Sequence, residues 1–290
     1  IQEGGDPTKG WHYEEMETIN SSLSYSTDVS TAKSLDVNRR GLCYQGQTHG
    51  NEGFLLSYEV GASIIASDKK YEDVLFPMLI ANDLIGVVNS MPSRFVIDFS
   101  RKSLLEAQTY PELYSIVVDK VLPDRKSAYN EEEERNSEAI DANPKARVNH
   151  HHRNFLNTWW ALSYPRQEML SAISKLPKYI ACGRVTKRPI FDFVSSDIHP
   201  NDALMVFAYS DNYTFGILQS SIHWEWFINK CSTLTARFRY TSDSVFDTFP
   251  WPQNPTEKSV RAVADAAKNY IKIRNRNRDE HKLSFRDLYR

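Results

Sequence analysis

Glycine is scarce in this chain, and the motifs that depend on it are missing. The sequence holds 11 glycines among 290 residues, which is well below the usual share of about 7%. It contains no G-x-G-x-x-G or G-x-x-x-x-G-K-[ST] phosphate loop, no G-x-S-x-G turn and no H-E-x-x-H pattern. It also has no Pro-Pro pair, which the Asn/Asp-Pro-Pro-aromatic loop of base-flipping methyl transfer requires. We therefore expect no catalytic residues and no cofactor site in this chain.

Cysteines and long apolar runs are sparse as well. Cys43, Cys182 and Cys231 lie far apart with no C-x-x-C pair, so neither a disulfide framework nor a zinc knuckle is indicated. No apolar run approaches the roughly 18 to 20 residues of a membrane span, and the first residues lack a signal-peptide pattern. The sequence does not begin with Met, from which we expect a fragment. A reducing, cytoplasmic location is the corresponding expectation.

The charged residues divide the chain into two unlike halves. Residues 1–144 carry 13 Lys and Arg against 24 Asp and Glu, whereas residues 145–290 carry 22 against 13. The net charge is therefore −11 in the first half and +9 in the second, although the whole chain carries only −2. A polyanionic partner for the second half would account for this asymmetry, and so would a solvated basic surface.

Composition divides the chain into three parts. Residues 1–38 are polar and rich in Ser and Thr, which predicts a linker or wrapping segment. Residues 39–252 form the main domain, and the polar stretch 126–150 within it is expected to be a mobile surface insertion. Residues 253–290 have a helical pattern with Thr256 as the N-cap.

The patterns predict an α+β fold with a mixed, mainly antiparallel sheet, flanking helices and a helical C-terminal tail. Two short strands are expected around the loop 46–53, and apolar spacing predicts a helix over 113–121 that ends before Pro123. The other expected strands are 94–99, 178–185, 190–194, 203–209, 213–218 and 235–240, and the other expected helices are 71–79, 166–176 and 221–229.

Three adjacent histidines are the pattern that most suggests a metal. His150, His151 and His152 cannot all face one ion in a regular element, and no cysteine or carboxylate pair lies at ligand spacing nearby. We therefore expect no metal site. His49, in the loop sequence QTHGN, could contact a phosphate or could be a solvated turn residue.

The stretch 231–252 is both basic and aromatic. Side chains alternate between the faces of a strand, so Thr235, Arg237 and Arg239 would project together, and Phe238 and Tyr240 would project from the opposite face. One hydroxyl and two guanidinium groups on one face can hold phosphates or read guanine edges in a major groove.

A second cationic turn runs from Arg184 to Arg188 and joins two expected strands. It could present further hydrogen-bond donors on the same side of the molecule as the first. Arginines that pair with surface carboxylates would give the same pattern, so the residues alone leave a purely structural role open.

Several segments together resemble one family. They are Gly41-Leu42, Gln45-Gly46, Gly53-Phe54, RFVIDF, TYPELY, VLPDR, Trp159-Trp160, KYIACGRVTKR, GILQSSIHWEW and RFRYTSDSVFDTFPWP. From about Arg39 to its end, the chain resembles the target-recognition domain and following helical region of single-chain DNA adenine methyltransferases. These are the bifunctional type II restriction-modification enzymes and the related phage-exclusion methyltransferases. The last segment is the most specific part of the match.

The resemblance implies a division of labour. An N-terminal methyltransferase domain of the same polypeptide would bind S-adenosylmethionine and take the flipped adenine, while this chain recognises double-stranded DNA and is not catalytic by itself. The parent would be a site-specific adenine methyltransferase of phage defence, with or without endonuclease activity. The implied DNA-contacting positions are Thr235, Arg237, Arg239 and, most nearly, Thr186, Lys187 and Arg188, to which we add Gln47 and His49.

Two alternatives remain open from the residues. A free-standing binder of RNA or single-stranded nucleic acid could stack bases on Trp159, Trp160 and Trp251. A nuclease could use a carboxylate cluster at Asp68 and Asp73 with Lys70, although the preceding acidic ligand is missing.

Overall fold

The computed structural model describes residues 29, 31–38, 41–231, 233–234 and 237–289. Its helices are α1 (Tyr58–Ser67), α2 (Ala81–Gly86), α3 (Leu104–Ala107), α4 (Pro111–Ala142), α5 (His151–Asn157), α6 (Gln167–Ile173), α7 (Asn212–Leu218), α8 (Ser221–Lys230), α9 (Glu257–His281) and α10 (Phe285–Leu288). Single turns of 3-10 helix occupy Glu52–Phe54 and Lys69–Asp73, and a single π-helical turn occupies Ser242–Phe246.

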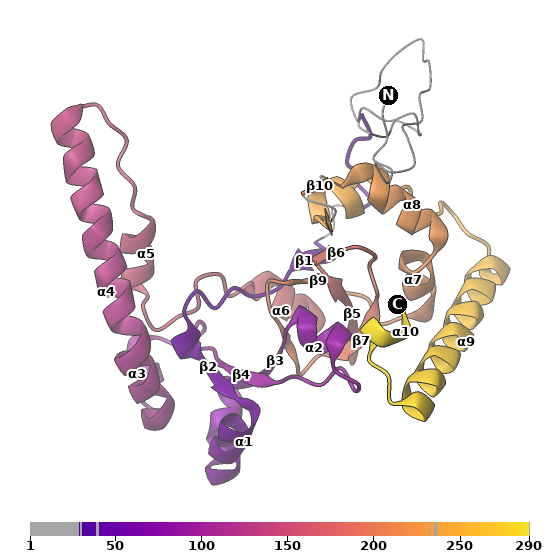
Figure 1. Ribbon diagram of the computed structural model, residues 1–290, viewed down its shortest axis with the longest axis horizontal. Helices are drawn as coiled ribbons and strands as arrows, with labels where there is room; N and C mark the ends of the chain where they lie inside the picture. Colours follow the sequence, from indigo (N-terminus) through magenta and orange to yellow (C-terminus); the bar gives the residue numbers. More distant parts are fainter. Residues whose placement is uncertain (1–28, 30, 39–40, 232, 235–236, 290) are drawn as a thin grey trace, which may run out of the picture.

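The described strands form three sheets (Figure 1). One has the order β1-β9-β5-β7, with β1 (Cys43–Gln45), β5 (Lys178–Gly183), β7 (Asp192–Ser195) and β9 (Leu204–Phe207) all antiparallel. A second has the order β2-β4-β3-β8, from β2 (Leu55–Ser57), β3 (Leu75–Leu79), β4 (Arg94–Ile97) and β8 (His199–Pro200), and only β3 and β8 run parallel. The third has the order β10-β11-β6, from β6 (Val185–Thr186), β10 (Thr233–Leu234) and β11 (Arg237–Arg239). The expected α+β fold with mainly antiparallel sheets is confirmed.

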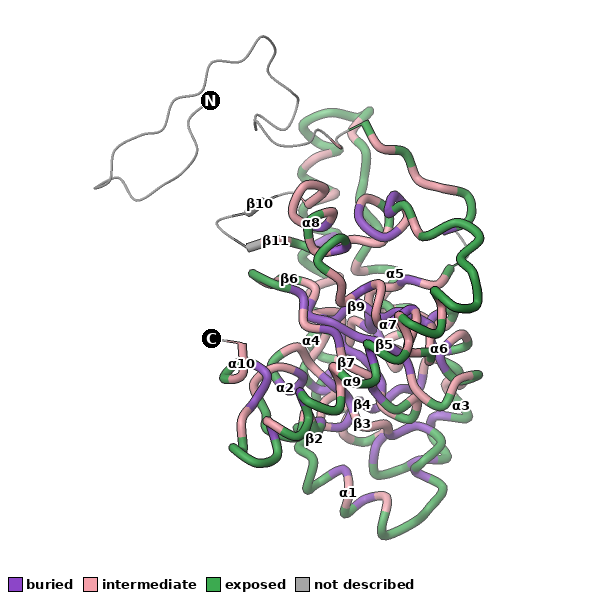
Figure 2. Tube along the Cα trace, turned by 90° about the vertical axis from the view of Figure 1, so that its right-hand side faces the viewer, coloured by how far each residue is buried: buried purple, intermediate pink, exposed green. Residues whose placement is uncertain are grey.

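The central sheet is buried on both faces. Ile180 and Cys182 of β5 pack into a cluster with α7, α8 and α9, whereas Tyr179 and Ala181 pack into a cluster with α6 and α2. This division follows from the two-residue period of a strand. Figure 2 shows β5 and β9 in purple through the middle of the molecule. The strand β6 directly follows β5 in the chain, so this buried sheet fixes where β6 lies.

Two predicted elements have the wrong secondary structure. The helix expected over 71–79 is a single 3-10 turn followed by β3, because Pro77 disfavours a helix interior and β3 pairs with β4. The strand expected over 213–218 is helix α7. The Asp211 side chain accepts from the Thr214 N–H as its N-cap, and Phe215 and Leu218 both turn into the core.

The helix α4 corrects one further prediction. It does not end before Pro123 but continues to Ala142, because Pro123 lies on the exposed side of the helix while Val121 and Arg125 continue the buried stripe. Most of the stretch 126–150 is helical, because α4 continues through it to Ala142 and α5 follows, and its role as a mobile surface insertion stays a prediction. Buried Glu132 accepts from the backbone N–H groups of residues 152 and 153 at the start of α5. The two helices form an arm along one side of the molecule (Figure 1).

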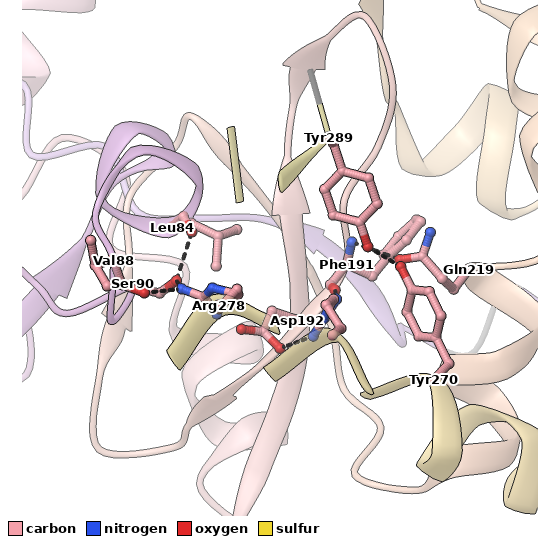
Figure 3. Close-up of polar contacts among 10 residues, drawn as sticks. Leu84, Val88, Ser90, Phe191, Asp192, Gln219, Tyr270, Arg278 and Tyr289 are labelled. Atoms are coloured by element: carbon pink, nitrogen blue, oxygen red, sulfur yellow. Dashed lines mark hydrogen bonds and ion pairs between the residues drawn. The ribbon is translucent and has the colours of Figure 1, made fainter. Parts of the chain in front are cut away.

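The C-terminal helices are fastened to the rest of the chain by two buried arginines of α9. Arg274 donates to the Phe191 carbonyl oxygen (2.7 Å) and to Asp192 Oδ1 (2.5 Å). Arg278 bonds the Val88 carbonyl oxygen and donates to Ser90 Oγ (3.0 Å), as Figure 3 shows. We call Arg274 and Arg278 the C-terminal anchor.

The described part of the expected N-terminal linker lies against the core. The Asn38 amide donates to the carbonyl oxygens of Phe246 and Phe249, and Lys230 Nζ donates to those of Val29 and Ala32. Residues 1–28 and 30 lie outside the described part of the chain. Among the described residues, no helix is both long and apolar enough to span a bilayer.

Candidate nucleic-acid interface

Two segments that are far apart in the sequence pair in the sheet β10-β11-β6. Strands β6 and β11 are antiparallel, with Phe238 opposite Thr186 and Arg239 opposite Val185. The pairing joins the two basic segments that the sequence predicts as contact sites. β10 flanks β11 on its other side.

The register gives this sheet one face toward the core and one toward solvent. Phe238 packs against Trp224 and Phe227 of α8, with ring centroids 6.2 and 5.7 Å apart. Neighbouring strand residues point to opposite faces, so Arg239 points away from α8, and it is exposed. Val185, directly opposite Arg239, is 54% exposed on the same face.

The turn after β6 offers two cations to solvent. The Thr186 hydroxyl donates to the Arg188 carbonyl oxygen (2.6 Å) and accepts from the Arg188 N–H (3.1 Å). This local bonding fixes the shape of the turn and leaves Lys187 and Arg188 exposed. The Arg188 guanidinium lies 6.0 Å from the ring centroid of Trp224. Thr186 therefore shapes the turn, and Lys187 and Arg188 are its outward groups.

Arg184 lies next to Arg239, since its carbonyl oxygen accepts from the Tyr240 N–H (2.8 Å). Burial lowers the pKa of Arg184, and the positive charges of Arg239 and Arg166 lower it further, while Asp202 acts in the opposite sense. No carboxylate of the described residues lies within 4.0 Å of a nitrogen of these three arginines. Mutual repulsion makes the cluster unfavourable by itself, so a bound anion would stabilise it. We define the cationic face as Arg166, Arg184, Lys187, Arg188 and Arg239.

Sequence reasoning did not find Arg166. The residue precedes α6 with a left-handed backbone (φ 52°), and its guanidinium lies 5.4 Å from the Tyr164 ring centroid. Its Nη2 donates to Gln45 Oε1 (3.5 Å). Only the tertiary fold brings this residue near Arg184, so no spacing in the sequence signals it.

The structure contradicts a DNA contact at Gln47. Its side chain is fully buried, and its amide nitrogen donates to Asp98 Oδ2 (2.8 Å) and to the Pro165 carbonyl oxygen (2.9 Å). Its Oε1 lies 2.9 Å from His199 Nδ1. The Gln47 side chain thus connects segments of the core by hydrogen bonds and is not exposed to a DNA partner. His49 is half-buried with Nδ1 3.1 Å from the Asn51 carbonyl oxygen, and its contact with DNA stays a prediction.

The remaining residues of the predicted strand are described in part. Thr235 lies outside the described residues, and Arg237 is described by its backbone, which lies in β11 opposite Leu234 of β10. The base-reading roles of Thr235, Arg237 and Arg239 therefore stay predictions.

The three tryptophans of the single-strand alternative have packing roles. Trp160 Nε1 donates to the Lys102 carbonyl oxygen (3.0 Å), and Trp159 packs against Tyr114. Trp251 packs between Phe246 and Phe249, and all three tryptophans are half-buried. This packing disfavours their use as platforms for unstacked bases.

The residues of the nuclease alternative also have structural roles. Asp68 accepts from the Lys70 backbone N–H (3.0 Å) and pairs with Lys70 Nζ (3.3 Å). Asp73 accepts from the Tyr110 hydroxyl (3.2 Å). Across the described part of the chain, no three His, Cys, Asp or Glu side chains gather in a way that could hold a metal ion.

Comparison with known proteins gives one family and one solved fold. Residues 31–253 match the family described as "MmeI, target recognition domain". The chain is similar in fold to the Type IIL restriction-modification enzyme MmeI in a structure with DNA, with a TM-score of 0.70 and 20% identity. The match covers 97% of this chain and 34% of the MmeI chain, so this chain spans about a third of that protein's length. No curated protein matches the chain. The chain belongs to the MmeI target recognition domain family.

Proposed function

We propose that this chain binds double-stranded DNA in a sequence-specific manner through the cationic face, as the recognition module of a restriction-modification methyltransferase. The observation that carries the proposal is the pairing of β6 with β11. It places Arg239 next to Arg184, with no carboxylate among the described residues within 4.0 Å of either guanidinium group.

The chemistry of the face suits a duplex. Strands of a small sheet can form a ribbon that enters the major groove, where a guanidinium can bond the O6 and N7 atoms of guanine, and β6 with β11 of the three-stranded sheet would form such a ribbon. Arg239 stands on the solvent face of such a ribbon and would read a base pair. Lys187 and Arg188 sit at the turn beyond β6, where cations would contact the phosphates that flank the site.

The catalytic steps belong to a different part of the proposed protein. A methyltransferase domain elsewhere in the same polypeptide would bind S-adenosylmethionine and methylate adenine at N6. This chain would select the site and hold the duplex while the base is flipped. Supplied alone with labelled S-adenosylmethionine and DNA, the chain should give no incorporation above background.

Binding to labelled duplexes at several salt concentrations tests the proposal. We expect the chain to bind a duplex more tightly than either single strand, with log K falling by about 0.9 per phosphate contact for each unit of log salt. Arg239→Ala should weaken this binding. Arg276→Ala, which removes an exposed arginine of α9 that pairs with Glu280, is the matched control and should not. A preference for single strands, or no duplex binding at low salt, would overturn the proposal.

A further inference from the structure

An exposed valine stands in the middle of the cationic face. Val185 is 54% exposed although it is β-branched and apolar. Its neighbours along the chain are Arg184 and Thr186, and Arg239 lies directly across from it. Val185 is not one of the buried residues that form the hydrophobic clusters. Burial in the core therefore does not explain the apolar side chain at this position.

The strand register fixes where Val185 lies relative to Arg239. Directly opposed residues of an antiparallel pair have Cβ atoms roughly 4.5–5.5 Å apart and side chains on the same face. Successive base pairs are separated by about 3.4 Å along the duplex axis. A ribbon that brings Arg239 to one base pair would thus bring Val185 to a pair directly beside it.

Only one chemical feature of the unmodified major groove suits an apolar side chain. Guanine, cytosine and adenine present hydrogen-bond donors and acceptors there, whereas thymine also presents a C5-methyl group. We propose that Val185 packs on the C5-methyl group of a pyrimidine, thymine in unmodified DNA, in the base pair next to the one that Arg239 reads. This inference rests on the proposed function and adds a specificity-determining contact to it. The recognised site would then contain an A·T pair adjacent to a G·C pair.

The experiment removes the methyl group from either partner. The recognised site is first selected from a random duplex pool with the wild-type chain. Each thymine of that site is then replaced by uracil, and affinity is measured for wild type and Val185→Ala. We expect one replacement to weaken wild-type binding about fourfold, the equivalent of one buried methyl group. The same replacement should leave Val185→Ala unchanged, because its contact is already lost.

Two controls make the effect specific. Leu105→Ala truncates another exposed apolar residue, 77% exposed on α3, and should keep the full response to uracil. Replacing cytosine by 5-methylcytosine at that position in a site where T·A is changed to C·G should restore part of the affinity. Restoration identifies the methyl group itself, rather than the rest of the thymine ring, as the group that Val185 contacts.

Failure of the inference differs from failure of the proposed function. If Arg239→Ala changes the selected site but no uracil replacement weakens binding, the duplex-binding function stands and the contact by Val185 is wrong. A site without an A·T pair beside the pair read by Arg239 would overturn it equally. If Val185→Ala weakens binding while uracil has no effect, Val185 acts through something other than a pyrimidine methyl group. If no site is selected at all, the proposed function itself fails.

Discussion

Two sets of arginines in this chain differ in their surroundings. The C-terminal anchor is buried and bonded to the chain: Arg274 pairs with Asp192 at 2.5 Å, and the Arg278 guanidinium lies 3.6 Å from the Phe285 ring centroid. In the cationic face, Arg239 is exposed, and burial together with the charges of Arg239 and Arg166 lowers the pKa of Arg184 against the opposing effect of Asp202. A charge count treats both sets alike. What separates a structural arginine from a binding one here is the partner that the fold supplies.

Loss of the anchor should give the largest change in stability. Arg274→Ala leaves Asp192 nearly buried without its cation, and burial already raises the pKa of that carboxyl against the opposing effect of the arginine. We expect the free energy of unfolding to fall by about 3–5 kcal/mol, measured by urea denaturation. Arg276→Ala should change it by less than about 0.5 kcal/mol. Equal effects of the two would show that the anchor is not structural.

Truncating an arginine of the cationic face should weaken DNA binding and leave the stability of the fold unchanged. We expect Arg239→Ala to weaken binding to the selected duplex by about 1–3 kcal/mol, as for one base contact, while the urea midpoint stays within error. Arg239→Lys keeps the charge but loses the planar pair of donors, so it should recover nonspecific affinity without the sequence preference. A fall in the urea midpoint as large as that of Arg274→Ala would make Arg239 part of the core.

Buried histidines should make stability depend on pH. Burial lowers the pKa of His199 and of His223 to about 4 each, below the value of about 6.5 in an unfolded chain. The unfolded state therefore binds more protons, and stability that is present above about pH 6.5 is lost as the pH falls toward 4. We expect a loss of about 1 kcal/mol per histidine between pH 7 and 5.5, measured by urea denaturation at each pH.

A variant identifies which group titrates. His199→Asn removes one of the two buried imidazoles and should reduce the pH dependence by about half, even though the variant is less stable at pH 7. If the slope between pH 7 and 5.5 is the same in wild type and variant, the dependence comes from other groups.

Lys187 should show the smallest effect. Its exposed position on the turn after β6 suits a phosphate contact, which carries no sequence information. Lys187→Ala should weaken binding equally for all duplexes and reduce the salt slope by about 0.9. The check is a salt titration on two unrelated duplexes. A loss confined to one duplex would instead assign Lys187 to base reading.

The sequence predicted those parts of the fold and site that depend on local pattern. Local patterns identified β4, β5 and β9 as strands and α8 as a helix. Strand alternation placed Arg239 and Phe238 on opposite faces of one strand. These features need only a few neighbouring residues, so the chain itself carries the signal.

Contacts between distant segments determine the features that the sequence did not predict. Pairing with β4 makes β3 a strand, and an exposed Pro123 lets α4 continue past the expected end. Gln47 lies in a polar loop sequence, but its bonds to Asp98 and His199 come from distant segments. Arg166 reaches the cationic face for the same kind of reason, and no local pattern could have indicated it.

Selection of binding sites from a random duplex pool, with wild type and Arg239→Ala side by side, tests the central claim most directly. The account predicts that wild type enriches one site, and that the variant loses its preference at a single G·C pair while its urea midpoint is unchanged. Enrichment of the same site with the same strength by both proteins would contradict it, because the cationic face would then not read the sequence.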